Sequence, residues 1–209
     1  MKYLISSSSI ILSIILMLTF NSTGTNTNEV PEEEDSLIVE EGSEAQPLGQ
    51  SDTCKANTYY DVPLSQELQD YTREICEEYD VDVEIILGIM KTESDFRHNV
   101  SSKNNIGGKR SVGITQLNEN HVNWYRELTQ NNSFNINNIK DNIKGGVLVY
   151  HNYKSYWQKQ GYEGEELISR SLLAYNRGVN GSKKYIKKNG INHNYVTKVL
   201  NYKNNLNKI

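Results

Sequence analysis

The sequence has few of the residues that break helices or cross-link a chain. Only three of its 209 residues are proline, and all three precede residue 64, so the rest of the chain favours helices over a loop-rich β fold. Two cysteines are too few for a disulfide-dense scaffold. The four histidines are far apart and form no His-Glu-x-x-His motif, which argues against a metalloprotease. We therefore expect neither a metal nor another cofactor.

The formal net charge of −4 is an average over three different segments. Residues 29–52 hold nine acidic residues and no basic ones. Residues 53–139 hold 13 acidic and 8 basic residues, and residues 140–209 hold 4 acidic and 13 basic residues. The acidic and basic parts of the chain are thus expected to have different surroundings and different partners.

An apolar run at residues 3–20 follows Lys2 and is typical of an export signal. Its 18 residues are at the short limit for spanning a bilayer, and no Ala-x-Ala cleavage site follows, so a cleaved signal peptide and a retained membrane anchor both fit. A buried N-terminal helix is the alternative without export. Export would place the rest of the chain at the outer face of the membrane or in the cell wall, where Cys54 and Cys76 could pair.

Residues 21–62 have the composition of a disordered linker. The segment is polar at first and then acidic, with a continuous acidic run at residues 32–35, and it cannot bury enough apolar surface to order itself. Self-repulsion would keep it extended, so it could hold a domain away from a membrane. An acidic recognition tail is the other interpretation.

Residues 63–209 are predicted to form one all-α domain. Apolar residues recur there at steps of three and four, and no strong alternating segment competes. Ser65 and Asp82 are candidate N-caps of the first two helices. The pattern predicts an irregular bundle of six or seven helices, over 65–79, 82–96, 136–157, 164–175 and 194–206, with a short turn and another helix within 114–128.

Glu93 has an unusual place in the second predicted helix. It lies three, four and seven residues after Met90, Ile89 and Ile86, so it falls on the apolar face. A buried carboxyl responds by a raised pKa, and a carboxyl that is protonated near neutral pH can act as a general acid. The alternative is that Glu93 ends the helix and pairs with an Arg or a Lys.

Several short motifs together resemble the catalytic domain of soluble lytic transglycosylases, which has a goose-lysozyme-like fold. They are, in order, Glu93-Ser94-Asp95-Phe96, Gly113-Ile114-Thr115-Gln116, Asn138-Ile139, Ala174-Tyr175-Asn176-Arg177-Gly178 and Tyr195-Val196. The resemblance covers about residues 64–205. Thr115 stands where the family's Gly-Leu-Met-Gln pattern has Met. This change from an apolar side chain to a hydroxyl is expected to alter either the local packing or a contact with the sugar.

The resemblance implies cleavage of peptidoglycan between N-acetylmuramic acid and N-acetylglucosamine. Glu93 would be the catalytic acid, and the product would carry a 1,6-anhydromuramyl end. The residues implied to bind the glycan strand are Ser94, Gln116, Tyr175, Asn176 and Tyr195. Tyr175 could also bond the Glu93 carboxyl and orient it. A goose-type muramidase that hydrolyses the same bond, or a wall-binding domain without catalysis, are the alternatives.

The C-terminal half also carries lysines at helical spacing. They are Lys183, Lys184, Lys187 and Lys188. A solvated helix face is the simplest interpretation, and attraction to anionic wall polymers is the functional one. No DNA-binding motif is present, so we expect no nucleic-acid partner.

Overall fold

The computed structural model describes residues 58–102 and 110–209. The predicted signal or anchor at 3–20, most of the predicted linker at 21–62, and the possible partner Cys54 lie outside these residues. Cys76 is buried, at 1% exposure. None of the helices in the described part of the chain is long and apolar enough to span a bilayer.

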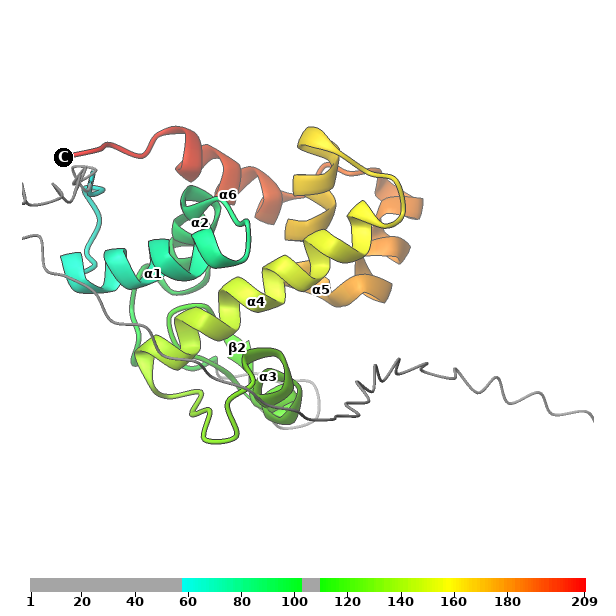
Figure 1. The fold of residues 1–209 in the computed structure, drawn as a ribbon. Helices are drawn as coiled ribbons and strands as arrows, with labels where there is room; N and C mark the ends of the chain where they lie inside the picture. The colour runs from blue at the N-terminus through cyan, green and yellow to red at the C-terminus, as the bar shows by residue number, and fades with distance from the viewer. Residues whose placement is uncertain (1–57, 103–109) are drawn as a thin grey trace, which may run out of the picture. The chain divides into compact units, whose positions relative to one another are not determined.

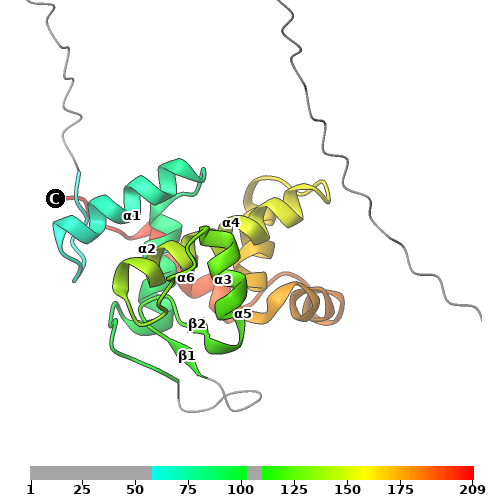
Figure 2. The same cartoon turned by 60° about the horizontal axis from the view of Figure 1, so that its bottom comes forward.

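The described residues form six α-helices and one small hairpin (Figures 1 and 2). The prediction of an all-α, lysozyme-like fold is confirmed. The helices are α1 (Gln66–Glu78), α2 (Val83–Ser94), α3 (Val122–Thr129), α4 (Ile139–Gln158), α5 (Gly164–Asn189) and α6 (Asn194–Asn204), and the hairpin pairs β1 (Ser111–Val112) with β2 (Leu117–Asn118).

Helix α2 is the centre of the main core. The sequence predicted one apolar face, but Ile85 and Leu87 are buried as completely as Ile86 and Ile89. Residues 85–90 are buried on every side of the helix, so this part of α2 must be covered all round. Helix α6 packs against it closely at Gly88, where an added Cβ would lie 2.8 Å from the Val199 carbonyl oxygen.

The side chains of Ser65 and Asp82 cap α1 and α2 as predicted, by accepting hydrogen bonds from the first-turn N–H groups. Two boundaries differ from the prediction. The segment 114–128, predicted to hold a short turn and then a helix, forms β2 and a short 3₁₀ turn before α3 begins at Val122. The backbone of α5 breaks at Gly178 (φ 69°, ψ 163°), and a second helical segment continues to Asn189.

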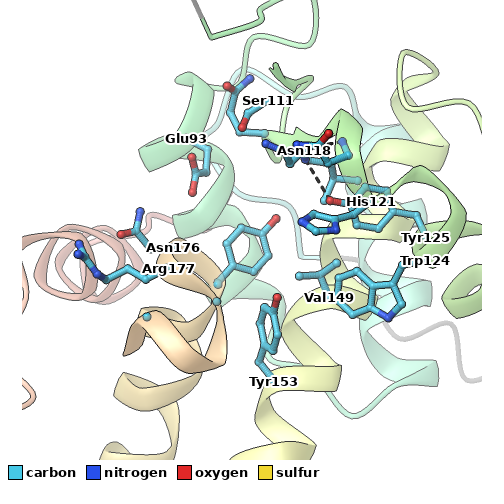
Figure 3. A pocket seen from close by; sticks show the side chains of 16 residues that line it. Glu93, Ser111, Asn118, His121, Trp124, Tyr125, Val149, Tyr153, Asn176 and Arg177 are labelled. Atoms are coloured by element: carbon cyan, nitrogen blue, oxygen red, sulfur yellow. Dashed lines mark hydrogen bonds between the residues drawn. The ribbon is translucent and has the colours of Figure 1, made fainter. Parts of the chain in front are cut away.

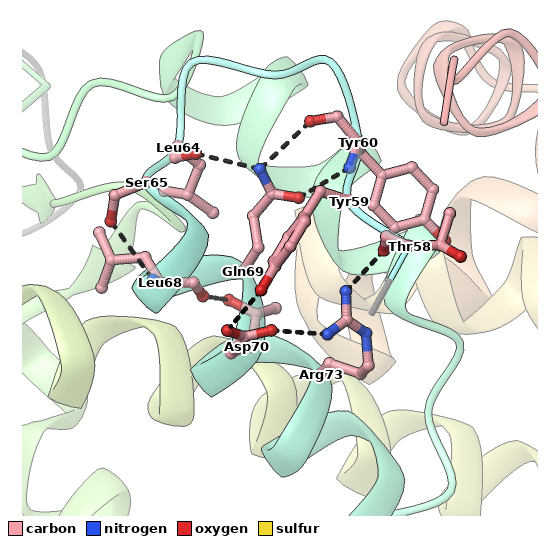
Figure 4. A network of polar contacts seen from close by, with 10 residues as sticks. Thr58, Tyr59, Tyr60, Leu64, Ser65, Leu68, Gln69, Asp70 and Arg73 are labelled. Atoms are coloured by element: carbon pink, nitrogen blue, oxygen red, sulfur yellow. Dashed lines mark hydrogen bonds and ion pairs between the residues drawn. The ribbon is translucent and has the colours of Figure 1, made fainter. Parts of the chain in front are cut away.

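The first described residues are bound to α1 by side-chain hydrogen bonds (Figure 4) and to the C-terminal segment by backbone hydrogen bonds. The side chain of Gln69, at 4% exposure, accepts a hydrogen bond from the Tyr60 N–H and donates to the carbonyls of Tyr60 and Leu64. The backbones of Tyr59 and Ile209 are hydrogen bonded in both directions, at 3.3 and 2.8 Å. Residues 58–62, assigned by composition to the linker, therefore belong to the folded domain.

Candidate active site

Glu93 lies in the last turn of α2, on the wall of an open cleft of about 680 Å³ (Figure 3). The helix ends at the next residue, Ser94, and is capped by Asp95, whose backbone is left-handed (φ 54°). Burial raises the pKa of Glu93 from 4.5 to about 7, and the nearby Tyr195 hydroxyl lowers it by a smaller amount. The carboxyl is thus partly protonated at neutral pH, as a general acid must be.

Glu93 has no ionic partner in residues 58–102 and 110–209. Of the nearby acids, Asp95 pairs with Lys91 on the surface, and Glu119 accepts hydrogen bonds from Arg110. Among the cleft-lining residues that the structure describes, Glu93 is the one carboxylic acid. Within the same ranges, no three His, Cys, Asp or Glu side chains are grouped as metal ligands would be.

Ser94 connects α2 to the segment 113–116 that borders the cleft. Its hydroxyl lies 2.8 Å from the Ile114 carbonyl oxygen and 3.1 Å from that of Met90, both of which are hydrogen-bond acceptors. The side chain is 2% exposed. This geometry favours a structural role for Ser94, in positioning its neighbour Glu93, over the predicted contact with substrate.

Thr115, the departure from the family pattern, faces the protein interior. It is fully buried, and its hydroxyl lies 3.0 Å from the Asn142 carbonyl oxygen and 2.9 Å from the side-chain Oδ1. A Cβ added to Gly146 would lie 2.7 Å from three Thr115 side-chain atoms. The absence of a side chain at Gly146 therefore makes room for Thr115. The Thr115 side chain packs against α4 in the interior, where it does not contact a sugar in the cleft.

Asn142 is the residue that fastens this segment to α4, and the sequence analysis missed it. Its side chain accepts from the Thr115 N–H at 3.0 Å and donates to the carbonyls of Val112 and Ile136, both at 2.9 Å. The Asn-Ile pair of the sequence motif lies one turn earlier, where Asn138 caps α4. A polar residue three positions after Ile139, on the apolar face, was the available signal.

The structure brings three other predicted residues to the cleft. Gln116 and Asn176 line it, and so does Tyr175. The Tyr175 hydroxyl donates to the Thr115 carbonyl at 2.9 Å, so its proton is not directed to Glu93 as predicted. It ties α5 to the segment that also holds Gln116, whose amide nitrogen donates to the Gly113 carbonyl at 2.8 Å.

Tyr195 takes the place beside Glu93 that was predicted for Tyr175. The Tyr195 side chain is buried on α6, and its hydroxyl lies near enough to influence the pKa of the carboxyl. The Tyr195 hydroxyl forms no hydrogen bond, either with the Glu93 carboxyl or with any other group in the described ranges. Tyr195 is therefore placed to act through Glu93, and it is not among the residues that line the cleft.

Aromatic side chains form another wall of the cleft, which the sequence analysis did not identify. They come from the start of α3 and from α4, and are His121, Trp124, Tyr125 and Tyr153. The Tyr125 hydroxyl accepts a hydrogen bond from the Asn118 N–H at 3.0 Å, which joins α3 to β2 (Figure 3). The sequence carries a sign of this wall, because aromatic residues at positions 121, 124 and 125 are three and four apart and therefore share one helix face. Flat apolar rings beside amide and hydroxyl groups suit a carbohydrate.

The helical fold, together with a cleft lined by polar and aromatic side chains around one buried carboxyl, is consistent with a lysozyme-like domain. The family model for the transglycosylase SLT domain matches residues 70–197, and the chain belongs to this family. Family membership implies a lytic-transglycosylase-type activity related to peptidoglycan. A search of curated proteins gave no significant match.

Proposed function

We propose that this protein is a peptidoglycan lytic transglycosylase in which Glu93 is the general acid and then the general base. The observation that supports this most is the single carboxyl of the described cleft lining, with its pKa raised to about 7 by burial. Glycoside hydrolysis ordinarily uses two carboxylates, one of which serves as nucleophile or activates water. Asp95 and Glu119 are both held outside the cleft lining, which favours a reaction in which the substrate supplies its own nucleophile.

In the first step, protonated Glu93 donates its proton to the glycosidic oxygen as the bond from C1 of N-acetylmuramic acid to that oxygen breaks. The N-acetylglucosamine side leaves as an alcohol. In the second step, the Glu93 carboxylate accepts the proton of the C6 hydroxyl of the same muramic acid while the C6 oxygen bonds to C1. The product is a 1,6-anhydro ring, no water is consumed, and Glu93 is again protonated.

The other cleft residues would hold the glycan. Gln116 and Asn176 offer amide groups to sugar hydroxyls and acetamido groups, and the aromatic wall at Trp124 and Tyr153 offers apolar faces. These contacts would fix the scissile bond near Glu93, which reduces the entropic part of the barrier.

The test is mass spectrometry of the fragments released from purified sacculi. A transglycosylase gives anhydro ends, which weigh one water less than the ends made by a goose-type muramidase. Hydrolytic ends would replace the proposal by the muramidase alternative. Release of nothing, together with co-sedimentation of the protein with sacculi, would support a wall-binding domain instead.

We also propose that residues 3–20 export the chain and that the domain works at the outer face of the membrane or in the wall. The substrate class supports this, because peptidoglycan lies outside the cytoplasmic membrane. Protease added to intact, wall-stripped cells should digest the domain, and protection would contradict the proposal.

The exposed lysines of the last part of α5 would then face anionic wall polymers, and neutralising them should weaken binding to such polymers.

A further inference from the structure

Arg177 is an exposed cation in the lining of the cleft. It follows Asn176 directly and precedes the backbone break at Gly178, so it stands where the first part of α5 ends. Figure 3 shows Asn176 and Arg177 on α5 and Glu93 on α2 around the same pocket. Glu93, Asn176 and Arg177 belong to the same lining, so a ligand that extends from Glu93 past Asn176 reaches Arg177.

The guanidinium group is positioned by an aromatic ring. Its central carbon lies 5.3 Å from the centre of the Tyr185 ring. Tyr185 is itself fixed, because its hydroxyl donates to the Asn192 carbonyl at 2.9 Å and its ring packs edge-on against His193 with centres 4.7 Å apart. Stacking restrains Arg177 without using its N–H donors.

No carboxylate in the described ranges forms an ion pair with Arg177. Of the other described arginines, Arg73, Arg110 and Arg170 pair with Asp70, Glu119 and Glu166. Arg97 and Arg126 form no ion pair within these ranges either, but neither lines the cleft. The one acid of the described cleft lining is Glu93, which is kept partly neutral by burial. The cleft thus offers a positioned cation that the protein leaves available.

The fork of N–H donors on arginine matches a carboxylate, which it binds through two parallel hydrogen bonds. Peptidoglycan carries carboxylates close to its glycosidic bonds, either on the stem peptide or on the lactyl group of a muramic acid without peptide. We propose that Arg177 binds a substrate carboxylate and makes the cleft selective for glycan strands that retain it. This inference rests on the proposed function and adds the feature of the substrate that the site recognises.

The experiment compares three substrates over a range of concentrations on both sides of KM. They are native sacculi, sacculi whose carboxylates have been converted to methylamides with carbodiimide, and glycan strands stripped of peptide by an amidase. For the wild type, kcat/KM should fall about tenfold or more on amidation, as expected for the loss of a charge-assisted bidentate contact. Arg177→Gln should show that loss on native sacculi already, mainly in KM, and should change little on amidation. Arg177→Lys should lie between the two.

Arg126→Gln is the matched control. Arg126 is an exposed arginine of α3 outside the cleft lining, bonded to Asn123 at 3.1 Å, and its variant should respond to amidation like the wild type. The proposal is overturned if Arg177→Gln keeps the native rate or loses as much as the wild type on amidation. If Arg177→Gln lowers kcat/KM on stripped glycan as well, the carboxylate that Arg177 binds is that of the lactyl group. If the loss occurs only on strands that carry peptide, the carboxylate belongs to the stem peptide.

Binding separates this inference from the proposed function. If the wild type releases no fragments from any substrate, the catalytic proposal fails. Co-sedimentation of wild type and Arg177→Gln with native and amidated sacculi still tests Arg177, because only the wild type should bind native sacculi more strongly than amidated ones. Equal binding by both proteins contradicts the inference. Since amidated sacculi test the unmodified protein, an unstable Arg177 variant does not block the test.

Discussion

Replacing Glu93 with Gln keeps the shape of the side chain and removes the proton that the proposed reaction transfers. With a pKa of about 7, roughly half of the Glu93 carboxyls are protonated at pH 7, whereas at a pKa of 4.5 fewer than about one in a hundred would be. General acid–base catalysis typically contributes about 10²–10⁴-fold, so the release of fragments should fall at least by that range. In the wild type, kcat/KM should fall as the pH rises above about 7, because the acid form disappears.

The same substitution should change the stability in a pH-dependent way. The folded pKa of Glu93 lies above the unfolded value, so the folded protein loses stability as the pH rises from about 4.5 to about 7. A shift of this size corresponds to about 3 kcal/mol. Glu93→Gln has no such loss. Its free energy of unfolding relative to the wild type should therefore be higher by up to about 3 kcal/mol at pH 8, and this gain should vanish near pH 4.

The assays are muropeptide release from sacculi and urea denaturation at several pH values. Asp95→Asn is the matched control, because Asp95 is exposed, pairs with Lys91, and has a left-handed backbone that Asn tolerates. It should retain most of the activity. Near-wild-type release by Glu93→Gln, or an inactive Asp95→Asn, would refute the assignment of the acid. A stability difference that is the same at pH 4 and pH 8 would refute the raised pKa.

Three further changes test how the site is held. Tyr195→Phe removes the hydroxyl that lowers the pKa of Glu93, so the pH above which kcat/KM falls should rise, with little change in Tm. An unchanged pH dependence of kcat/KM would contradict this role. Asn142→Ala should lower the free energy of unfolding by about 2–4 kcal/mol in urea titrations, because the Thr115 N–H and two carbonyls lose their buried partner. Deleting residues 58–63 from a 58–209 fragment should lower Tm by several degrees, and an unchanged Tm would show that this segment contributes nothing.

The sequence was most informative where structure is decided locally. Ser65 and Asp82 cap helices because their side chains reach N–H groups two or three residues away. The apolar spacing of α2 predicted that Glu93 shares a face with the buried Ile86, Ile89 and Met90, but its assignment as the acid came from the resemblance carried by the Glu93-Ser94 motif. The hairpin was not predicted, because its two-residue strands are too short to show an alternating pattern and depend on pairing across the turn.

Contacts between distant segments could not be predicted in the same way. The hydroxyl of Tyr175 could reach either Glu93 or the backbone of Thr115, 60 residues away, and only the packing of α5 on the hairpin side decides between them. The prediction ended the helix at residue 175, because glycine at position 178 is typical of a helix end. The lysines at 183–188 already showed helical spacing, but only the structure shows that they continue α5 after the break.

The hydrogen-bonded backbones of Tyr59 and Ile209 have a consequence for how this domain could be rebuilt. Because residues so far apart in sequence are neighbours in space, a short peptide could join them without disturbing α1 or α6. New termini could then be opened at an exposed turn elsewhere, such as the one at Gly161, where φ is 85° and no atom lies within 4 Å of an added Cβ. Because residues 59 and 209 are adjacent, the whole domain could also be inserted into a surface loop of a host protein, with both connections to the host at nearly the same place.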